Sequence, residues 1–264
     1  MGRLAHLQQS LGPAASQPRS SCIVVDYSCP DHCGDWVEQH FPAVQVVRVP
    51  DQPGFNPARA RNRGAAAAKA PWLCFFDADV ILDANFAAQA LSRVQAGNYY
   101  VAQPGRKALT GTVVCAREDF LRVGGYDEVY QGWAEEDLDL YDHFLFCGMK
   151  RQGFPQEWLT PIAHADDLRV QHHALKSPQV SQTINVLYRR AKYDLMRQIA
   201  RELTEEERRG LHAEASRLVQ NCLQNRQETQ WRIPYRLSTS SLGLEYSASL
   251  VYTMKPDSSN TAPA

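Results

Sequence analysis

The chain has 264 residues, of which 44% are hydrophobic and 22% are charged, so it is long enough for one large domain and an appendage. Its net charge of −1 gives no electrostatic reason to expect nucleic acid or an anionic membrane as its main partner. Because the sequence contains no run of about 18 apolar residues and no basic region followed by an apolar core, we expect neither a transmembrane segment nor a secretion signal.

The first quarter of the chain alternates helix and strand signals. Leucines recur at helical spacing from Leu4, and Gly12-Pro13 is expected to end this first helix. Residues 22–26 form an apolar run that ends in an acid, which is typical of a buried strand. A helix over residues 35–41 and a strand over residues 44–49 follow. Alternation of this kind predicts a parallel sheet with right-handed crossovers.

The seven cysteines are odd in number and scattered along the sequence. We therefore expect reduced thiols in a cytoplasmic protein rather than a disulfide framework. A zinc site at Cys29 and Cys33 is disfavoured, because the two lie three residues apart rather than two.

Residues 56–69 predict a helix of small residues that can pack closely against a sheet. Asn56 suits the N-cap and Pro57 the first helical position, and a run of alanines follows. The arginines of this helix are either solvated or directed at a ligand. In the second case Arg61 would face a diphosphate, because guanidinium groups pair well with phosphate oxygens.

Residues 72–82 contain the acidic motif on which the functional interpretation centres. Trp72 to Phe76 are all apolar, as in a strand buried on both faces, and Asp-Ala-Asp follows. Ligand crevices of open α/β sheets lie just beyond the carboxyl ends of strands. In an extended chain Asp77 and Asp79 would point the same way and would suit a hard divalent cation with a phosphate ligand. An acidic loop after a strand is the simpler alternative.

Three segments in the first third of the chain resemble the nucleotide-binding half of the family 2 glycosyltransferases. They are Ile-Val-Val-Asp-Tyr-Ser-Cys-Pro-Asp (23–31), Asn-x-Ala-Arg-Ala-Arg-Asn-x-Gly-Ala (56–65) and Phe-Phe-Asp-Ala-Asp (75–79). Residues 123–128 and 132–139 resemble the acceptor-side motif of the β-1,4-galactosyltransferases and chondroitin-polymerase-type enzymes. The resemblance implies an α/β GT-A fold, a Rossmann-like and mostly parallel sheet flanked by helices.

The start of the chain departs from the family pattern. Family members begin with a central strand that helps to hold the uracil ring, and a helix like residues 2–11 comes only after it. This sequence opens on the helix, so the first strand is missing and Met1 is interpreted as an internal methionine. The alternative is that the protein does without this strand. In either case we expect a gap, a distorted sheet or a substituted strand beside residues 23–26.

The resemblance also implies roles for individual acids. Asp79 would bind Mn²⁺ or Mg²⁺, Asp77 would contact the ribose or share the metal, and Asp26 would lie under the uridine. Asp137 corresponds by position to the catalytic base, and Glu136 precedes it as a residue that hydrogen-bonds the acceptor. An acid-rich first helical turn that complements the helix dipole is the structural alternative for this last pair.

The chemistry of sugar transfer is consistent with these roles. A bound metal would stabilise the leaving diphosphate as a Lewis acid, and a carboxylate base would act on the opposite side of the anomeric carbon. Direct attack opposite the leaving group inverts the anomeric configuration. Trp133 offers an apolar plate of the kind on which sugars stack. Ala134 and Glu135 replace two glycines of the galactosyltransferase motif, which puts in doubt a close backbone approach to the acceptor.

A further metal ligand is expected downstream of the acidic motif. The galactosyltransferases place a metal-binding histidine at this distance, and His164 fits it best, with His172 as the reserve. A histidine in the core or on the surface is the alternative. His143 is interpreted as structural.

The chain is predicted to divide into a GT-A domain over residues 1–178, a helical appendage over 179–230 and a strand-like segment with a disordered tail over 231–264. Within the first domain, residues 1–105 form the nucleotide-sugar half and residues 106–178 the acceptor and metal half. The appendage contains two helical stripes, the second after the Thr204–Glu207 capping box, and these cover the catalytic domain or form a homo-oligomer.

Three functions are compatible with the sequence. The first is an inverting, metal-dependent glycosyltransferase that moves a hexose or N-acetylhexosamine from a UDP-sugar to a saccharide acceptor, as in bacterial surface polysaccharide synthesis. The second is an inactive or truncated nucleotide-sugar-binding module, which the absent first strand favours. The third is a nucleotidyltransferase, which would not need the Gly-Trp-acidic segment and usually shows a glycine-rich phosphate loop.

Overall fold

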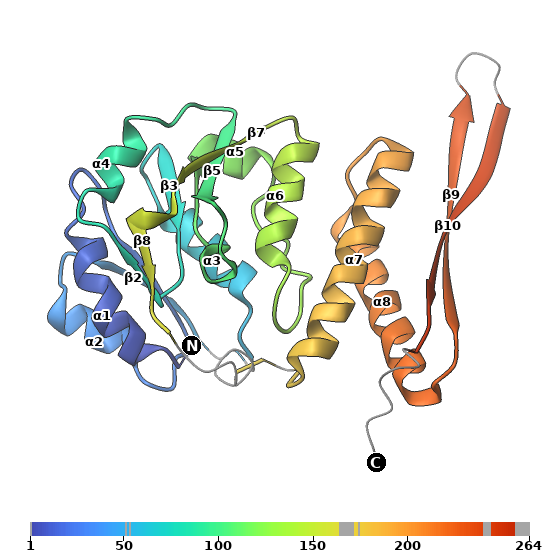
Figure 1. Ribbon diagram of the computed structural model, residues 1–264, viewed down its shortest axis with the longest axis horizontal. Coiled ribbons are helices and arrows are strands. Elements are labelled where there is room, and N and C mark those ends of the chain that lie inside the picture. The colour runs from blue at the N-terminus through green and yellow to red at the C-terminus, as the bar shows by residue number, and fades with distance from the viewer. Residues whose placement is uncertain are drawn as a thin grey trace. The chain divides into compact units, whose positions relative to one another are not determined.

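The computed structural model describes residues 2–50, 52, 54–163, 172–173, 175–239 and 244–256. The chain forms two compact units (Figure 1). The N-terminal unit comprises Met1–Glu128 and Glu136–Lys176, and the C-terminal unit comprises Val129–Glu135 and Ser177–Ala264. Within the described residues, no helix has the length and apolar character needed to cross a membrane.

The N-terminal unit is a mixed α/β structure. Its first half contains α1 (Leu4–Ala15), β1 (Ile23–Tyr27), α2 (Cys33–His40), β2 (Gln45–Val49), α3 (Pro57–Ala67), β3 (Trp72–Phe75) and β4 (Val80–Leu82). Its second half contains α4 (Phe86–Leu91), β5 (Asn98–Gln103), β6 (Val113–Ala116), α5 (Arg117–Arg122), α6 (Glu136–Phe146), β7 (Lys150–Pro155) and β8 (Leu159–Pro161).

Strand pairing in this unit is more mixed than the sequence predicted. The pairs β1/β2 and β5/β7 are parallel, whereas β3/β6, β5/β6 and β4/β8 are antiparallel. Among the described residues, β1 pairs only with β2, and β3 pairs only with β6. The sheet is therefore interrupted between β1 and β3, which confirms the gap that was expected beside residues 23–26.

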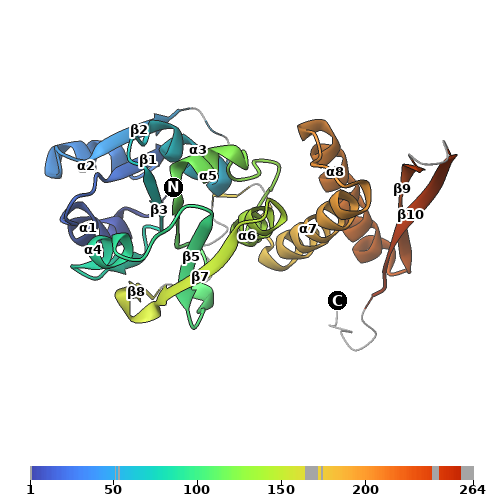
Figure 2. The same ribbon diagram turned by 90° about the horizontal axis from the view of Figure 1, so that it is seen from above.

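Helices cover both faces of the sheet, as Figures 1 and 2 show. On one face Tyr99 and Val101 of β5 pack with α5 and α6, and on the other face Tyr100 and Ala102 pack with α4. Alternate side chains of one strand therefore enter two separate apolar clusters. Helix α1 belongs to the face that carries α2 and α4, and α3 belongs to the opposite face with α5 and α6.

Two local predictions were wrong. Burial on both faces is found for β5 and β6, whereas β3 alternates and leaves Cys74 exposed. An apolar run alone does not tell a central strand from a strand with one open side. Helix α1 also continues past Gly12-Pro13 to Ala15. Because Pro13 lies in the last turn, it removes only one helical hydrogen bond, and the Ser16 N–H still donates to Gly12 O at 3.1 Å.

The C-terminal unit consists of two long helices and a hairpin. Helix α7 (Pro178–Ile199) begins at Ser177, whose hydroxyl accepts the Val180 N–H, and α8 (Glu205–Asn225) begins at the predicted Thr204–Glu207 capping box. Strands β9 (Thr229–Thr239) and β10 (Leu244–Met254) pair antiparallel over their full length. The hairpin thus starts two residues before the strand-like segment predicted from residue 231.

The loop Val129–Glu135 is bound to α7 through backbone carbonyls. The Asn185 amide donates to the carbonyls of Gln131, Trp133 and Ala134 at 3.0, 3.3 and 3.0 Å. The Ser181 hydroxyl accepts the Trp133 N–H at 2.6 Å. The C-terminal unit therefore includes a segment that the sequence placed in the catalytic domain.

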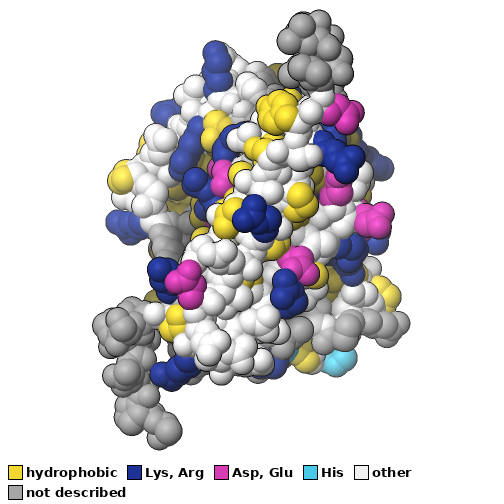
Figure 3. Space-filling view, turned by 90° about the vertical axis from the view of Figure 1, so that its right-hand side faces the viewer, with side chains coloured by type: hydrophobic (Ala, Val, Ile, Leu, Met, Phe, Trp, Pro, Cys, Tyr) yellow, Lys and Arg dark blue, Asp and Glu magenta, His cyan; other side chains and the backbone are white. Residues whose placement is uncertain are grey.

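The outward face of the hairpin carries a mixture of charges (Figure 3). Arg232 and Arg236 are exposed there on β9, and Val251 and Ser247 lie opposite them on β10. Basic and acidic side chains are interspersed over this face rather than gathered in one patch. This pattern agrees with the near-neutral net charge of the chain.

Candidate functional site

Arg61 is the centre of a cluster of acids in the N-terminal unit. Its guanidinium lies 2.7 Å from Asp77 Oδ1, 2.9 Å from Glu136 Oε1 and 3.2 Å from Asp137 Oδ1. The same group lies over the Tyr126 ring, 5.2 Å from its centroid. The structure thus brings together four residues that the sequence singled out, and three acids share one cation.

Local sequence explains how each member of this cluster is positioned. Helix α3 begins as predicted, because the Asn56 side chain accepts the Arg59 N–H at 2.9 Å and Pro57 occupies the first turn. This places Arg61 one turn into the helix. Asp77 follows the end of β3, and Glu136 and Asp137 are the first residues of α6. Asp77 and Glu136 are 16 and 75 positions from Arg61 in the sequence, and both contact its guanidinium.

Burial distinguishes the two sides of the cluster. The side chains of Arg61, Glu136 and Asp137 are 12%, 10% and 14% exposed, whereas that of Asp77 is 46% exposed. Burial raises the pKa of the Asp137 carboxyl well above its usual range, and Arg61 opposes part of that rise. Burial also opposes the charge of Arg61, but Asp137, Asp77 and Glu136 together hold its pKa well above the usual value. Asp137 is therefore a stronger base than a solvated aspartate.

A loop that the sequence analysis missed closes one side of the cluster. A side chain added at Gly111 would meet Asp77 Oδ2 at 2.5 Å and Arg61 Nη2 at 3.0 Å, so only glycine fits there without a shift. The neighbouring Thr110 carbonyl accepts a hydrogen bond from the Tyr141 hydroxyl of α6. The loop between β5 and β6 is thereby tied to the helix that carries the acids. No local signal identifies Gly111, because its role comes from contacts distant in sequence.

Asp77 and Asp79 are not arranged as the extended chain predicted. The segment turns after β3, with the Val80 N–H donating to the Asp77 carbonyl at 3.0 Å. Asp77 Oδ1 pairs with Arg61, whereas Asp79 Oδ2 lies 3.9 Å from the Arg3 guanidinium. The expectation of an extended Asp-Ala-Asp segment was therefore wrong. The turn forms because Val80 begins β4, which pairs with β8.

Asp26 has a structural role at the end of β1. It is 6% exposed, and its carboxylate accepts the N–H groups of Cys29 and Gly34 at 2.9 and 3.1 Å. Arg48 adds a contact of 3.3 Å to Oδ2. The Gly34 N–H belongs to the first turn of α2, where a carboxylate is favoured. The residue predicted to lie under the uridine thus fixes the turn after β1.

Of Trp133 and the three histidines that the sequence singled out, three fall on residues that the structure describes. His164 is outside the described residues. His172 packs against Gly2, and burial lowers its pKa. Trp133 belongs to the C-terminal unit and is held by α7. His143, interpreted as structural, is buried on α6.

The two residues that replace motif glycines keep a glycine-like backbone. Ala134 and Glu135 have φ angles of 77° and 82°, and Gly132 just before them has 75°. A left-handed conformation costs a residue with a side chain about 1–2 kcal/mol. The Asn185 hydrogen bonds and the Glu135–Arg189 ion pair at 2.8 Å hold the segment in this shape. Ala134 and Glu135 therefore adopt a backbone conformation that favours glycine.

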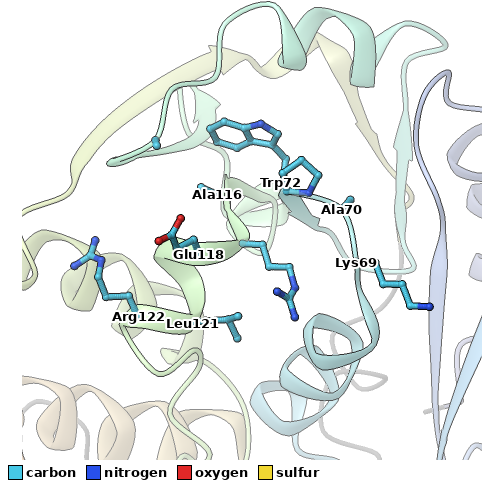
Figure 4. A pocket seen from close by; sticks show the side chains of 10 residues that line it. Lys69, Ala70, Trp72, Ala116, Glu118, Leu121 and Arg122 are labelled. Atoms are coloured by element: carbon cyan, nitrogen blue, oxygen red, sulfur yellow. The ribbon is translucent and has the colours of Figure 1, made fainter.

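A separate groove lies at the opposite end of β3. It has a volume of about 820 Å³ and is lined by residues that include Lys69, Trp72, Glu118 and Arg122 (Figure 4). None of the predicted site residues lines it. It begins where β3 starts, whereas Asp77 follows the end of that strand.

A protein-family model matches the N-terminal half of the chain. The model of "Glycosyl transferase family 2" matches residues 6–138, half of the chain. The chain belongs to glycosyl transferase family 2. No curated protein sequence matches it. The family match begins in α1 and ends in the first turn of α6, so it includes Arg61 and all three acids of its cluster.

Solved structures show that this family 2 chain has a GT-A fold. GalNAc-T7, crystallised with UDP, GalNAc and Mn²⁺, aligns with a TM-score of 0.54 and 15% identity over 80% of this chain and 52% of its own. The chain thus spans about half the length of that protein. TarS (1–349) of S. aureus aligns with a TM-score of 0.50 and 12% identity over 85% of this chain and 70% of its own.

Replacing Arg61 tests whether the acids depend on it. Arg61→Met leaves three acids without their cation, and we expect it to lower the free energy of unfolding by about 3–5 kcal/mol. The exposed Arg63→Met on the same helix is the control and should change it by less than about 0.5 kcal/mol. Denaturant unfolding followed by circular dichroism gives both values, and equal midpoints for the two variants would contradict the cluster.

Replacing Ala134 tests the strained loop. Ala134→Gly should raise stability by about 1 kcal/mol, because glycine adopts φ 77° without a steric cost. Ala66→Gly, at an exposed position inside α3, should lower it by about 0.5–1 kcal/mol. If thermal unfolding shows both glycines to be destabilising, the loop does not have this backbone conformation.

Proposed function

We propose that this protein is an inverting, metal-dependent glycosyltransferase that moves a hexose or N-acetylhexosamine from a UDP-sugar to a saccharide acceptor. The observation that carries the proposal is the Arg61 cluster. Arg61 pairs with Asp77, which follows β3, and with Glu136 and Asp137, which begin α6. Family members bind the donor after β3, and the related motif at α6 binds the acceptor. A transferase needs both sides within reach of one anomeric carbon.

Asp137 is assigned as the general base. It is the buried acid whose pKa burial raises, so it takes the proton of an acceptor hydroxyl more readily than a solvated aspartate does. Glu136 is assigned to hydrogen-bond the acceptor, and Arg61 holds it at 2.9 Å. A single base acting opposite the leaving group gives inversion of configuration.

The donor side is assigned to Asp26, Arg61 and Asp77. Two backbone N–H groups hold the Asp26 carboxylate in place, and it is assigned to lie under the uridine. Asp77 is the exposed member of the cluster and is the one that a ribose or a cation can reach. Arg61 is already paired with acids, so its role toward a diphosphate would require a change of partners. Trp133 is assigned to the stacking of a sugar ring.

The exposed carboxylate of Asp77 is the member of the cluster that suits a divalent cation. Asp77, Glu136 and Asp137 place three carboxylates around one guanidinium, so acids outnumber cations there, and carboxylate oxygens are the ligands that Mn²⁺ and Mg²⁺ prefer. Asp79 and Asp77 are assigned as ligands, with His164 as the third. When bound, such an ion supplies positive charge to the leaving diphosphate. GalNAc-T7 was crystallised with Mn²⁺ and UDP.

A direct assay separates this function from the alternatives. The protein is incubated with several UDP-sugars and Mn²⁺, and UDP release is scored with and without a saccharide acceptor. A transferase releases UDP with at least one donor and stops when the metal is chelated. A binding module or a nucleotidyltransferase releases no UDP under these conditions. Bacterial surface polysaccharides are the acceptors to try first, and a homo-oligomer formed through α7 and α8 remains a prediction.

Replacing Asp79 tests the metal site. Asp79→Ala should abolish the Mn²⁺-dependent part of UDP-sugar binding in calorimetry, because a ligand is lost, while circular dichroism stays native. Glu118→Ala removes an exposed acid remote from the cluster and should bind as the unaltered protein does. UDP binding with Mn²⁺ that is unchanged in Asp79→Ala would remove this residue from the metal site.

Replacing Asp137 tests the base. Asp137→Asn keeps the shape of the side chain but cannot accept the proton, so turnover should fall by roughly 10²- to 10⁴-fold while donor binding is kept. Asp142→Asn, on the same helix, is the matched control and should retain turnover. A near-normal kcat for Asp137→Asn would exclude this residue as the base.

A further inference from the structure

Two buried thiols lie side by side at the start of α2. Cys29 and Cys33 are 7% and 8% exposed, and their Sγ atoms and an Asp26 carboxylate oxygen all lie within 4.8 Å of one another. Both cysteines are free thiols. The Gly2 N–H donates to Cys29 Sγ at 3.3 Å. The glycosyl-transfer chemistry assigns no role to either sulfur.

Hydrogen bonds to the backbone fix the positions of the two cysteines. Asp26 accepts the N–H groups of Cys29 and Gly34, and the His32 N–H donates to the Cys29 carbonyl at 3.1 Å. Cys33 is the first residue of α2, so its position is fixed by the helix. The turn between the two cysteines therefore presents them to each other in a defined geometry.

The cluster has too few available ligands for a structural metal. Both Asp26 oxygens already accept hydrogen bonds, and Arg48 contacts one of them at 3.3 Å. Among the residues that the structure describes, two thiols remain in this cluster, whereas a structural zinc site takes four ligands. A pair of adjacent thiols without further ligands suits thiol–disulfide exchange.

The pKa of the Cys29 thiol also differs from the pKa values of other cysteines of the chain. A hydrogen bond donated by the Cys33 thiol lowers the pKa of Cys29 to about 5, although burial acts in the opposite direction. Burial raises the pKa of Cys22 to about 11 and that of Cys115 further. The thiolate is the form that attacks a disulfide, so Cys29 is the reactive partner and Cys33 the resolving one.

We propose that Cys29 and Cys33 form a thiol–disulfide exchange site that a low-molecular-weight disulfide closes reversibly. The Cys29 thiolate attacks one sulfur of the disulfide RSSR, whose S–S bond breaks and releases RS⁻. Cys33 then loses its proton and attacks the Cys29 sulfur of the mixed disulfide, which releases the second RS⁻. Two protein thiols are oxidised to one disulfide, and RSSR is reduced to two thiols, so atoms and electrons balance.

The position of this site links it to the donor side of the proposed transferase. Cys29 and Gly34 are the residues whose N–H groups hold Asp26, the residue assigned to the uridine. A disulfide between Cys29 and Cys33 therefore acts on the turn that positions Asp26. The exchange itself needs no sugar or nucleotide, so its test stands or falls independently of transferase activity.

The test uses the reduced full chain with a chelator and glutathione disulfide as the probe. After alkylation with N-ethylmaleimide, a protease that cuts before aspartate separates residues 26–30 from residues 31–34, because Asp31 lies between the two cysteines. We expect these two peptides to be joined by a disulfide that dithiothreitol removes. Cys22 falls in a different peptide and does not interfere.

Serine variants show which cysteine attacks the added disulfide and which one resolves the mixed disulfide. Cys33→Ser should stop at a mixed disulfide on Cys29, Cys29→Ser should form no link, and Cys222→Ser, on α8, should behave as the unaltered protein does. Circular dichroism of each variant confirms the fold. The proposal is overturned if both cysteines stay alkylatable in the unaltered chain at millimolar glutathione disulfide, or if the mixed disulfide accumulates there without closing.

Discussion

The structure of the N-terminal unit depends on one guanidinium shared by three carboxylates. Arg61 is anchored on α3, and its partners come from the end of β3 and the start of α6. Without the cation, Glu136 and Asp137 would be two adjacent, almost buried acids, which is an unfavourable arrangement. The ion pairs therefore connect α3 to the end of β3 and the start of α6, and the same ion pairs form the candidate site.

Local signals in the sequence predicted the local structure well. The Asn56 cap, Pro57 and the capping box at Thr204 specify helix starts through neighbouring residues, and the structure confirms them. Strand pairing was harder to predict. The apolar run at Trp72–Phe76 does not reveal that β3 pairs antiparallel with β6, nor that β5 is the strand covered on both faces. Those properties depend on partners distant in sequence.

The site was predictable in its members but not in its contacts. The resemblance implied roles for Asp77, Glu136 and Asp137, and the sequence left Arg61 either solvated or directed at a diphosphate. The ion pairs of Arg61 with these acids were not foreseen. The turn at Asp77 forms because Val80 starts a strand whose partner, β8, lies far along the chain. Gly111 was missed for the same reason, since nothing beside it in the sequence indicates its contact with Asp77.

The C-terminal unit is assembled from two separate stretches of the chain. Asn185 satisfies the carbonyls of a loop that precedes it by about fifty residues, and that loop continues directly into Glu136. Glu135 is bound by Arg189 and the next residue by Arg61, so a single peptide bond connects two ion pairs. A cut in the chain before α7 would therefore separate this helix from the loop that it holds, and with it from the segment that leads into the acids of α6.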